Sequence, residues 1–167
     1  MADEPPFPVN AVNVLRTAQQ INVQLSAMAD QKASILMGAA FVIFTIAMNQ
    51  AHGALPPLPL LILGVSAFVA AVCAVLAIMP AAGTKPRGPA NLLFFGHFAQ
   101  LEEEEFTEAM LEILRSDEAS YRAMLRDMHQ NGLVLARRKY RMLAYAYRAL
   151  LAGMTASLVA FAAERFI

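Results

Sequence analysis

A basic cluster late in the chain has the chemistry to bind a phosphate group. Arg138 and Lys139 form its centre, Arg137 and Arg141 flank them, and Tyr140 adds an aromatic ring and a hydroxyl. Arginine and lysine side chains hold phosphate oxygens through charge-assisted hydrogen bonds. The alternative is the ordinary positive cluster at the cytoplasmic end of a membrane helix, which by itself would account for most of these charges.

Two further pairs of residues are candidates for the same ligand. Asp30 and Lys32 could hold a phosphate or gate a helix bundle, although anchoring at the membrane interface and a surface ion pair explain them equally well. Phe95 could stack a planar ring of a ligand on its own ring, and we expect Gly96 to form a tight turn. Phe94 and Phe95 are more often buried against a bilayer or a bundle.

Residues for catalysis or metal binding do not occur in a recognisable pattern. The sequence contains no Ser-His-Asp order, P-loop or Rossmann glycine pattern. His97, His129 and the run 102–105 of glutamates lack the spacing of metal ligands, and Cys73 is the single cysteine. We therefore predict a protein that is not an enzyme, with no catalytic residues, metal or cofactor. Thirteen basic and thirteen acidic residues balance, so charge does not indicate a nucleic acid partner.

Long uncharged stretches predict that the chain spans a membrane. Hydrophobic residues make up 58% of the sequence, and no Asp, Glu, Lys or Arg occurs from Ala33 through Thr84. A helix needs about 20 apolar residues to cross a bilayer. We predict spans at 33–50 and 58–80, joined as a hairpin by a proline-containing turn. A third span at 142–163 is interrupted by Arg148, and its alternative is a helix lying in the interface.

The basic residues predict the orientation. Nine of the thirteen lie in the segment 81–141, and none lies in the hairpin turn. Positive-inside counting therefore places this segment in the cytoplasm, with the N-terminus cytoplasmic and the C-terminus periplasmic.

The cytoplasmic parts are expected to be helical. Residues 1–32 contain an amphipathic helix that continues into the first span, and its apolar positions are Val14, Ala18, Ile21, Leu25 and Met28. Two helices follow a Pro/Gly linker at 81–91, with a break at Ser116 and Asp117 and a bend at Gly132. The predicted fold class is an all-α membrane protein with three transmembrane helices and a small cytoplasmic helical bundle.

Small residues at four-residue spacing predict close helix contacts in the spans. The sets are Ser34 and Gly38; Ser66, Ala70 and Ala74; Ala152, Ala156 and Ala160; and Gly153 and Ser157. Contacts within one chain or between copies would both use such faces. Three helices enclose no pore, so a permeabilising activity would require a homo-oligomer.

Four segments, in their order around the hairpin, are similar to a known family. They are 29–33 (A-D-Q-K-A), 76–80 (L-A-I-M-P), 91–96 (N-L-L-F-F-G) and 138–143 (R-K-Y-R-M-L). In these features the chain resembles, from about Ile21 to about Ala163, the transmembrane effectors of Pycsar, a bacterial anti-phage system.

This resemblance implies a function. A partner pyrimidine cyclase would make cyclic CMP or cyclic UMP during infection, and this ligand would activate the effector to damage the cell inner membrane and cause abortive infection. The expected ligand-binding residues are Asp30, Lys32, Phe95, Gly96, Arg138, Lys139 and Tyr140. The alternative function is a structural or anchoring subunit of a membrane complex.

Overall fold

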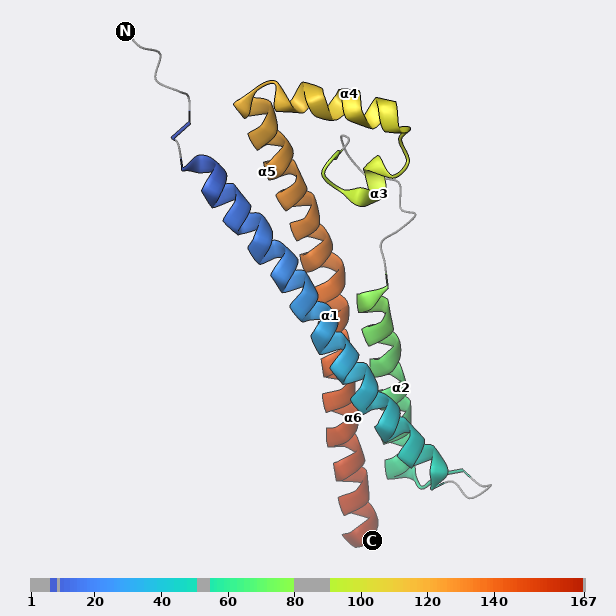
Figure 1. Cartoon of the computed structure of the whole chain (residues 1–167). Helices are drawn as coiled ribbons and strands as arrows, with labels where there is room; N and C mark the ends of the chain where they lie inside the picture. Colours follow the sequence, from blue (N-terminus) through green and yellow to red (C-terminus); the bar gives the residue numbers. More distant parts are fainter. Residues whose placement is uncertain (1–6, 9, 51–54, 80–90, 167) are drawn as a thin grey trace. The chain divides into compact units, whose positions relative to one another are not determined.

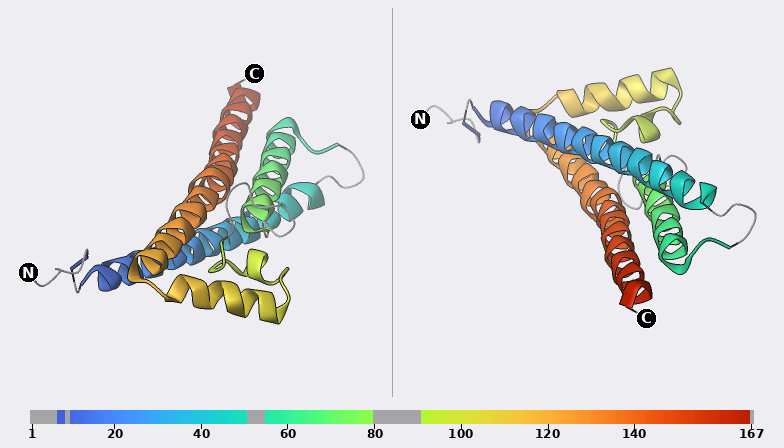
Figure 2. Two further views of the ribbon diagram at one scale, coloured as in Figure 1. Left: turned by 90° about the horizontal axis from the view of Figure 1, so that it is seen from above. Right: turned by 90° about the horizontal axis from the view of Figure 1, so that it is seen from below.

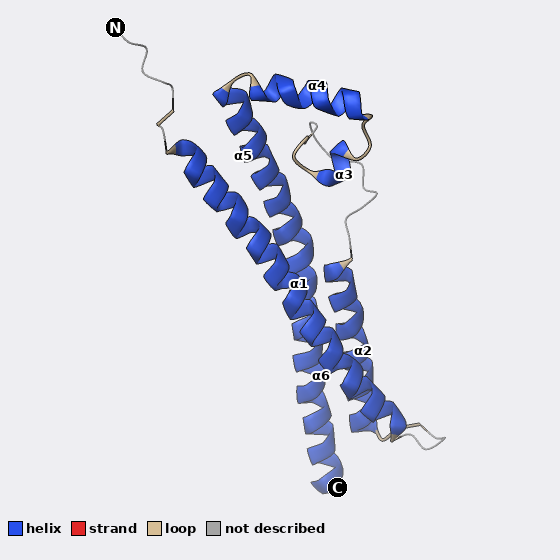
Figure 3. Ribbon diagram, viewed as in Figure 1, coloured by secondary structure: helices blue, strands red, loops and turns tan. Residues whose placement is uncertain are grey.

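Every regular element in the described part of the chain is a helix (Figures 1 and 3). The computed structural model describes residues 7–8, 10–50, 55–79 and 91–166. The elements are α1 (Ala11–Asn49), α2 (Leu58–Ile78), α3 (Phe95–Phe98), α4 (Glu103–Leu114), α5 (Asp117–Val134), the π-helix η1 (Leu135–Tyr140) and α6 (Arg141–Phe166). The all-helical prediction is confirmed. Most of the predicted hairpin turn and the linker 81–90 lie outside the described residues.

In the described part of the chain, three helices are long and apolar enough to cross a membrane, as the sequence predicted. They are Ala11–Asn49, Leu58–Ile78 and the continuous helical stretch Asp117–Phe166. The unbroken α1 also confirms that the N-terminal helix continues into the first apolar stretch. The borders of the spans and their direction across the membrane remain predictions.

The chain divides into two compact units. The first unit comprises Met1–Leu25 and Pro80–Val134, and the second unit comprises Ser26–Met79 and Leu135–Ile167. Helix α1 contributes residues to both, so each unit is described by itself.

The second unit is held together by short apolar side chains. α2 and α6 lie side by side, and part of α1 packs against them (Figures 1 and 2). Short side chains allow helix backbones to approach closely, which favours helix association in lipid. The buried core consists of Ala33, Leu36, Ala40, Ala67, Ala70, Ala74, Ala77, Leu143, Ala146 and Leu150. The four α2 alanines recur every three or four residues, so they lie on one face of that helix.

Gly153 of α6 lies at a close contact with α2. A Cβ atom at this position would overlap the Oγ and Cβ of Ser66 in α2. Ser66 directs its hydroxyl to the carbonyl of Leu63 in its own helix, at 2.9 Å, so the hydroxyl is already hydrogen-bonded. The absence of a side chain at Gly153 is therefore required for α2 and α6 to lie this close.

Only some of the predicted small-residue faces form contacts within the chain. Ala70, Ala74 and Gly153 are buried, which agrees with the prediction. Ser34 and Gly38 are exposed, and a Cβ atom at Gly38 would meet no atom within 4 Å. Ala152 and Ala156 are also exposed. Within the chain, α1 uses a neighbouring face, centred on Ala33 and Ala40, and α6 uses the face of Gly153. Contacts of the exposed faces between copies stay a prediction.

The first unit contains the helices around the predicted break. α4 begins with Glu103, Glu104 and Glu105 in its first turn, where the positive end of the helix dipole favours acidic residues. It meets α5 at a sharp turn (Figure 1). The hydroxyl of Ser116 accepts a hydrogen bond from the Ala119 N–H at 3.1 Å, so Ser116 caps α5. The predicted break is confirmed.

Two expectations for this unit are corrected. α5 remains α-helical through Gly132, and the irregular geometry begins only at Leu135, where the π-helix starts. The apolar positions of the N-terminal helix also fail to form the core of a bundle, because Val14, Ile21 and Leu25 are exposed. Where α1 contacts α5, the described hydrogen bond is made by the neighbouring Gln19.

Candidate functional site

An ion pair joins two of the predicted ligand-binding residues. The Nζ atom of Lys139 lies 2.6 Å from Oδ2 of Asp30, and it donates a second hydrogen bond to Oγ of Ser26 at 2.8 Å. The side chain of Lys139 is 19% exposed and that of Asp30 is 38% exposed. The pair is thus partly withdrawn from water. In such a place a charge interaction is stronger than at a fully exposed surface.

The local helix geometry positions these three groups. Ser26 and Asp30 are four residues apart in α1, so both side chains lie on one face of the helix. Lys139 lies in η1, whose wider turns change the direction of side chains relative to a continuing α-helix. The π-helical segment therefore sets which basic residue of the cluster points toward Asp30.

The ion pair leaves hydrogen-bonding capacity unused on both partners. Oδ1 of Asp30 is buried and has no hydrogen-bond partner among the residues that the structure describes. A lysine ammonium has three N–H donors, and the described contacts of Lys139 use two. Lys139 can therefore still donate to an anionic ligand.

The remaining predicted residues of the second unit do not join this pair. Lys32 is exposed, whereas Arg138 and Tyr140 are half-buried. Within the described residues, none of these three side chains makes a hydrogen bond or ion pair with Asp30 or Lys139. Lys139 is thus the residue of the basic cluster that pairs with Asp30.

Phe95 and Gly96 belong to the first unit and are described separately from the ion pair. The ring of Phe95 is 62% exposed, and its centroid lies 5.0 Å from that of Phe94. Gly96 lies inside the single-turn helix α3 rather than in a separate tight turn. A Cβ atom there would lie 2.6 Å from Cε1 of Phe94, so the ring of Phe94 accounts for the glycine.

The sequence analysis missed a polar cluster around Asp127 in the first unit. Asp127 accepts hydrogen bonds from Gln19 at 3.3 Å, Asn91 at 3.1 Å and Asn131 at 2.9 Å. Asn91 is 3% exposed and also donates to Gln130 at 3.0 Å. The spacing of Asp127, Gln130 and Asn131 could have indicated one polar face of α5. The partners Gln19 and Asn91 carry no such signal, since they lie far away in the sequence.

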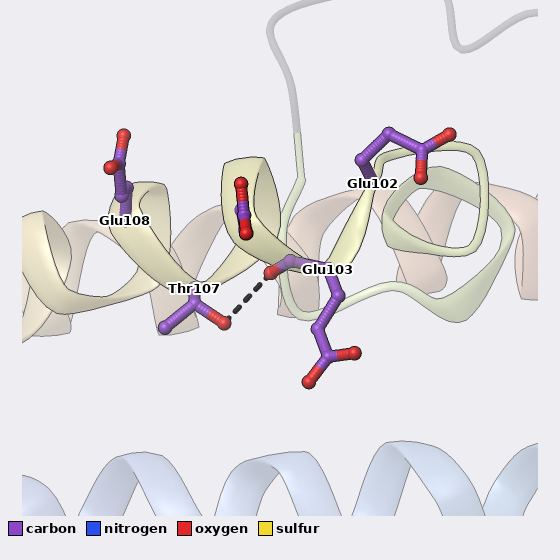
Figure 4. A pocket seen from close by; sticks show the side chains of 5 residues that line it. Glu102, Glu103, Thr107 and Glu108 are labelled. Atoms are coloured by element: carbon purple, nitrogen blue, oxygen red, sulfur yellow. Dashed lines mark hydrogen bonds between the residues drawn. The ribbon is translucent and has the colours of Figure 1, made fainter.

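The glutamate run forms a shallow acidic surface at the start of α4. Figure 4 shows the side chains of Glu102 and Glu108 pointing to a different side of the helix from that of Glu103. Thr107 donates a hydrogen bond to the Glu103 carbonyl at 2.8 Å. No group of three or more metal-ligating side chains occurs in the described part of the chain.

The chain matches a known protein family. A model of the Pycsar effector protein domain matches residues 13–164, nearly the whole chain. The chain belongs to the Pycsar effector family. No curated protein and no solved structure matches it significantly.

Membership gives the general role of the protein. Pycsar effectors are membrane effectors of anti-phage defence that act with a partner cyclase. The three helices that could cross a membrane agree with a membrane location for this effector. The matched segment 13–164 includes Ser26, Asp30 and Lys139, so the ion pair lies within the family domain.

Proposed function

We propose that a cyclic pyrimidine nucleotide, cyclic CMP or cyclic UMP, activates this effector to impair the bacterial inner membrane. Family membership supports the defence role, and the ion pair between Asp30 and Lys139 carries the proposal for the ligand. The N-terminus and residues 81–141 lie in the cytoplasm in this proposal, where a cyclase product is available. The C-terminus is then periplasmic.

Lys139 is the proposed contact for the cyclic phosphate, which carries one negative charge. Its third N–H donor, which no contact among the described residues uses, lets the phosphate bind beside Asp30. The two anions repel, so binding weakens the contact between Lys139 and Asp30. Arg138 directly precedes Lys139 in the sequence and Tyr140 directly follows it, and both are proposed as secondary contacts. The roles of Lys32, Phe95 and Gly96 in binding stay predictions.

Loss of this ion pair would change how α1 is held against η1, which continues into α6. A ligand shifts a conformational equilibrium only by as much as it binds one state more tightly. The nucleotide binds best to the state in which Lys139 is released from Asp30, and that state is the one that leaks. Because three helices enclose no pore, the leaking state contains several copies of the chain.

Binding to the full-length effector in lipid nanodiscs tests this proposal. We expect titration calorimetry to detect binding of one pyrimidine nucleotide and little binding of cyclic AMP or cyclic GMP. Arg115→Met is a suitable control, since Arg115 is an exposed basic residue whose ion pair among the described residues is with the exposed Glu112. This variant should bind like the unmodified protein. Equal binding of purine nucleotides, or no binding by correctly inserted protein, would contradict the proposal.

A further inference from the structure

An apolar stripe of α1 remains uncovered in the first unit. Val14, Ala18, Ile21 and Leu25 follow one another at spacings of four, three and four residues. Val14 is 67% exposed, Ile21 51% and Leu25 36%. Alternating steps of three and four residues define the seam of a coiled coil, in which each apolar side chain fits between residues of a second helix.

Lipid cannot cover this stretch if α1 crosses the membrane. The stripe from Val14 to Leu25 precedes the uncharged segment that begins at Ala33. An amphipathic helix can bury such a stripe by lying flat in the membrane interface. α1 is unbroken from Ala11 to Asn49, so its first half cannot lie flat while its second half spans the bilayer.

The same spacing continues along the rest of α1. The next positions are Met28, Lys32, Ile35, Ala39, Val42 and Ile46. All six are exposed within the chain. The alanine face that packs inside the second unit contains Ala29, Ala33 and Ala40, which lie one residue further along and therefore about 100° away around the helix. Both faces can be occupied at once.

We define the α1 seam as the positions at this spacing from Val14 to Ile46, including Lys32. We propose that the α1 seam binds the α1 seam of a second copy of the chain in a parallel coiled coil. Copies inserted in one membrane share one orientation, so their α1 helices are parallel and each seam residue meets its own equivalent. A symmetric contact of this kind requires a self-complementary surface, and an apolar seam without acidic residues meets that requirement. The inference deepens the oligomeric effector proposed above and rests on it for its role in activation.

Lys32 is the one charged position of the seam. In a parallel pair, two Lys32 ammonium groups would approach each other, and their repulsion would weaken association. A lysine in a coiled-coil seam lowers stability while limiting the arrangements that the helices can adopt. Lys32→Leu should therefore strengthen the contact.

Disulfide crosslinking of the full-length protein in native membranes tests the seam. In a Cys73→Ala background, which removes the single natural cysteine, Ile21→Cys and Leu25→Cys should form disulfide-linked dimers on mild oxidation. Val23→Cys is the matched control, because Val23 lies in the same helix, is 69% exposed and is off the seam. We expect severalfold more dimer at positions 21 and 25 than at 23, and a further increase when Lys32→Leu is added. Comparable maleimide labelling of all variants would show equal access.

Equal crosslinking at position 23, or no dimer at 21 and 25, would overturn the seam. The experiment needs no nucleotide, so its outcome is separate from that of the proposed function. Efficient crosslinking in a protein that binds no cyclic nucleotide would leave the seam intact and contradict only the activation mechanism. Nucleotide binding without crosslinking would contradict the seam and leave the proposed nucleotide ligand intact.

Discussion

Replacing Lys139 with methionine is expected to abolish the response of the effector to its nucleotide, while replacing Asp30 with asparagine is expected to strengthen that response. Lys139 supplies the proposed phosphate contact, so its loss removes binding. Asp30→Asn removes the negative charge that competes with the phosphate, and we expect about a tenfold lower half-saturating concentration, equivalent to about 1.4 kcal/mol. Titration of each variant in liposomes measures both effects.

The opposite effects of these two substitutions on the nucleotide response distinguish an ion pair that the ligand breaks from one that only stabilises the fold. If the pair only stabilised the fold, both substitutions would weaken the response, because each leaves one partly buried charge without its partner. Lys139→Arg keeps the charge and should retain part of the response. Glu112→Gln breaks an exposed ion pair of α4 and should change nothing, since exposed pairs contribute little.

Introducing a methyl group at Gly153 is expected to destabilise the second unit. The added Cβ would overlap Ser66, so α2 and α6 would have to move apart and lose contacts along their alanine faces. Overpacking of this kind costs about 1–3 kcal/mol. Gly153→Ala should therefore unfold at lower denaturant concentration in detergent than the unmodified protein does.

Two variants make this prediction specific to the contact. Gly38→Ala adds the same methyl group to α1, at a position where the new Cβ would meet no atom within 4 Å. We expect at most a small change in stability. Ser66→Gly removes the overlapped atoms and leaves only the Cα of residue 66, at 3.5 Å from the new Cβ, so it should restore much of the stability of Gly153→Ala. If Gly38→Ala destabilised the protein as much as Gly153→Ala does, the close contact between Gly153 and Ser66 would not explain the effect.

The helices were predictable because they follow from local composition and spacing. Uncharged stretches of span length and the unbroken apolar pattern before Ala33 indicated α1 and α2 directly. The break at Ser116 was also predictable, since a serine cap is a local hydrogen bond. The π-helix at Leu135–Tyr140 was not predictable, because a change from α-helical to i→i+5 hydrogen bonding leaves no clear mark in local composition or spacing.

The contacts between residues far apart in the sequence were harder to predict from the sequence. Asp30 and Lys139 were both candidates, but nothing in their surroundings in the sequence indicated that they would pair. Several small-residue faces were equally plausible, and only tertiary contacts selected the face of Ala33 and that of Gly153. The Asp127 cluster was missed for the same reason, since its partners come from three separate segments.

The most direct test of the central claim is membrane depolarisation by the purified effector in liposomes that hold a potassium gradient. A potential-sensitive dye would report the response as cyclic CMP, cyclic UMP, cyclic AMP and cyclic GMP are added one at a time. We predict depolarisation by a pyrimidine nucleotide and none by the purine nucleotides. No response to any of the four, from correctly inserted protein, would contradict a nucleotide-gated membrane effector.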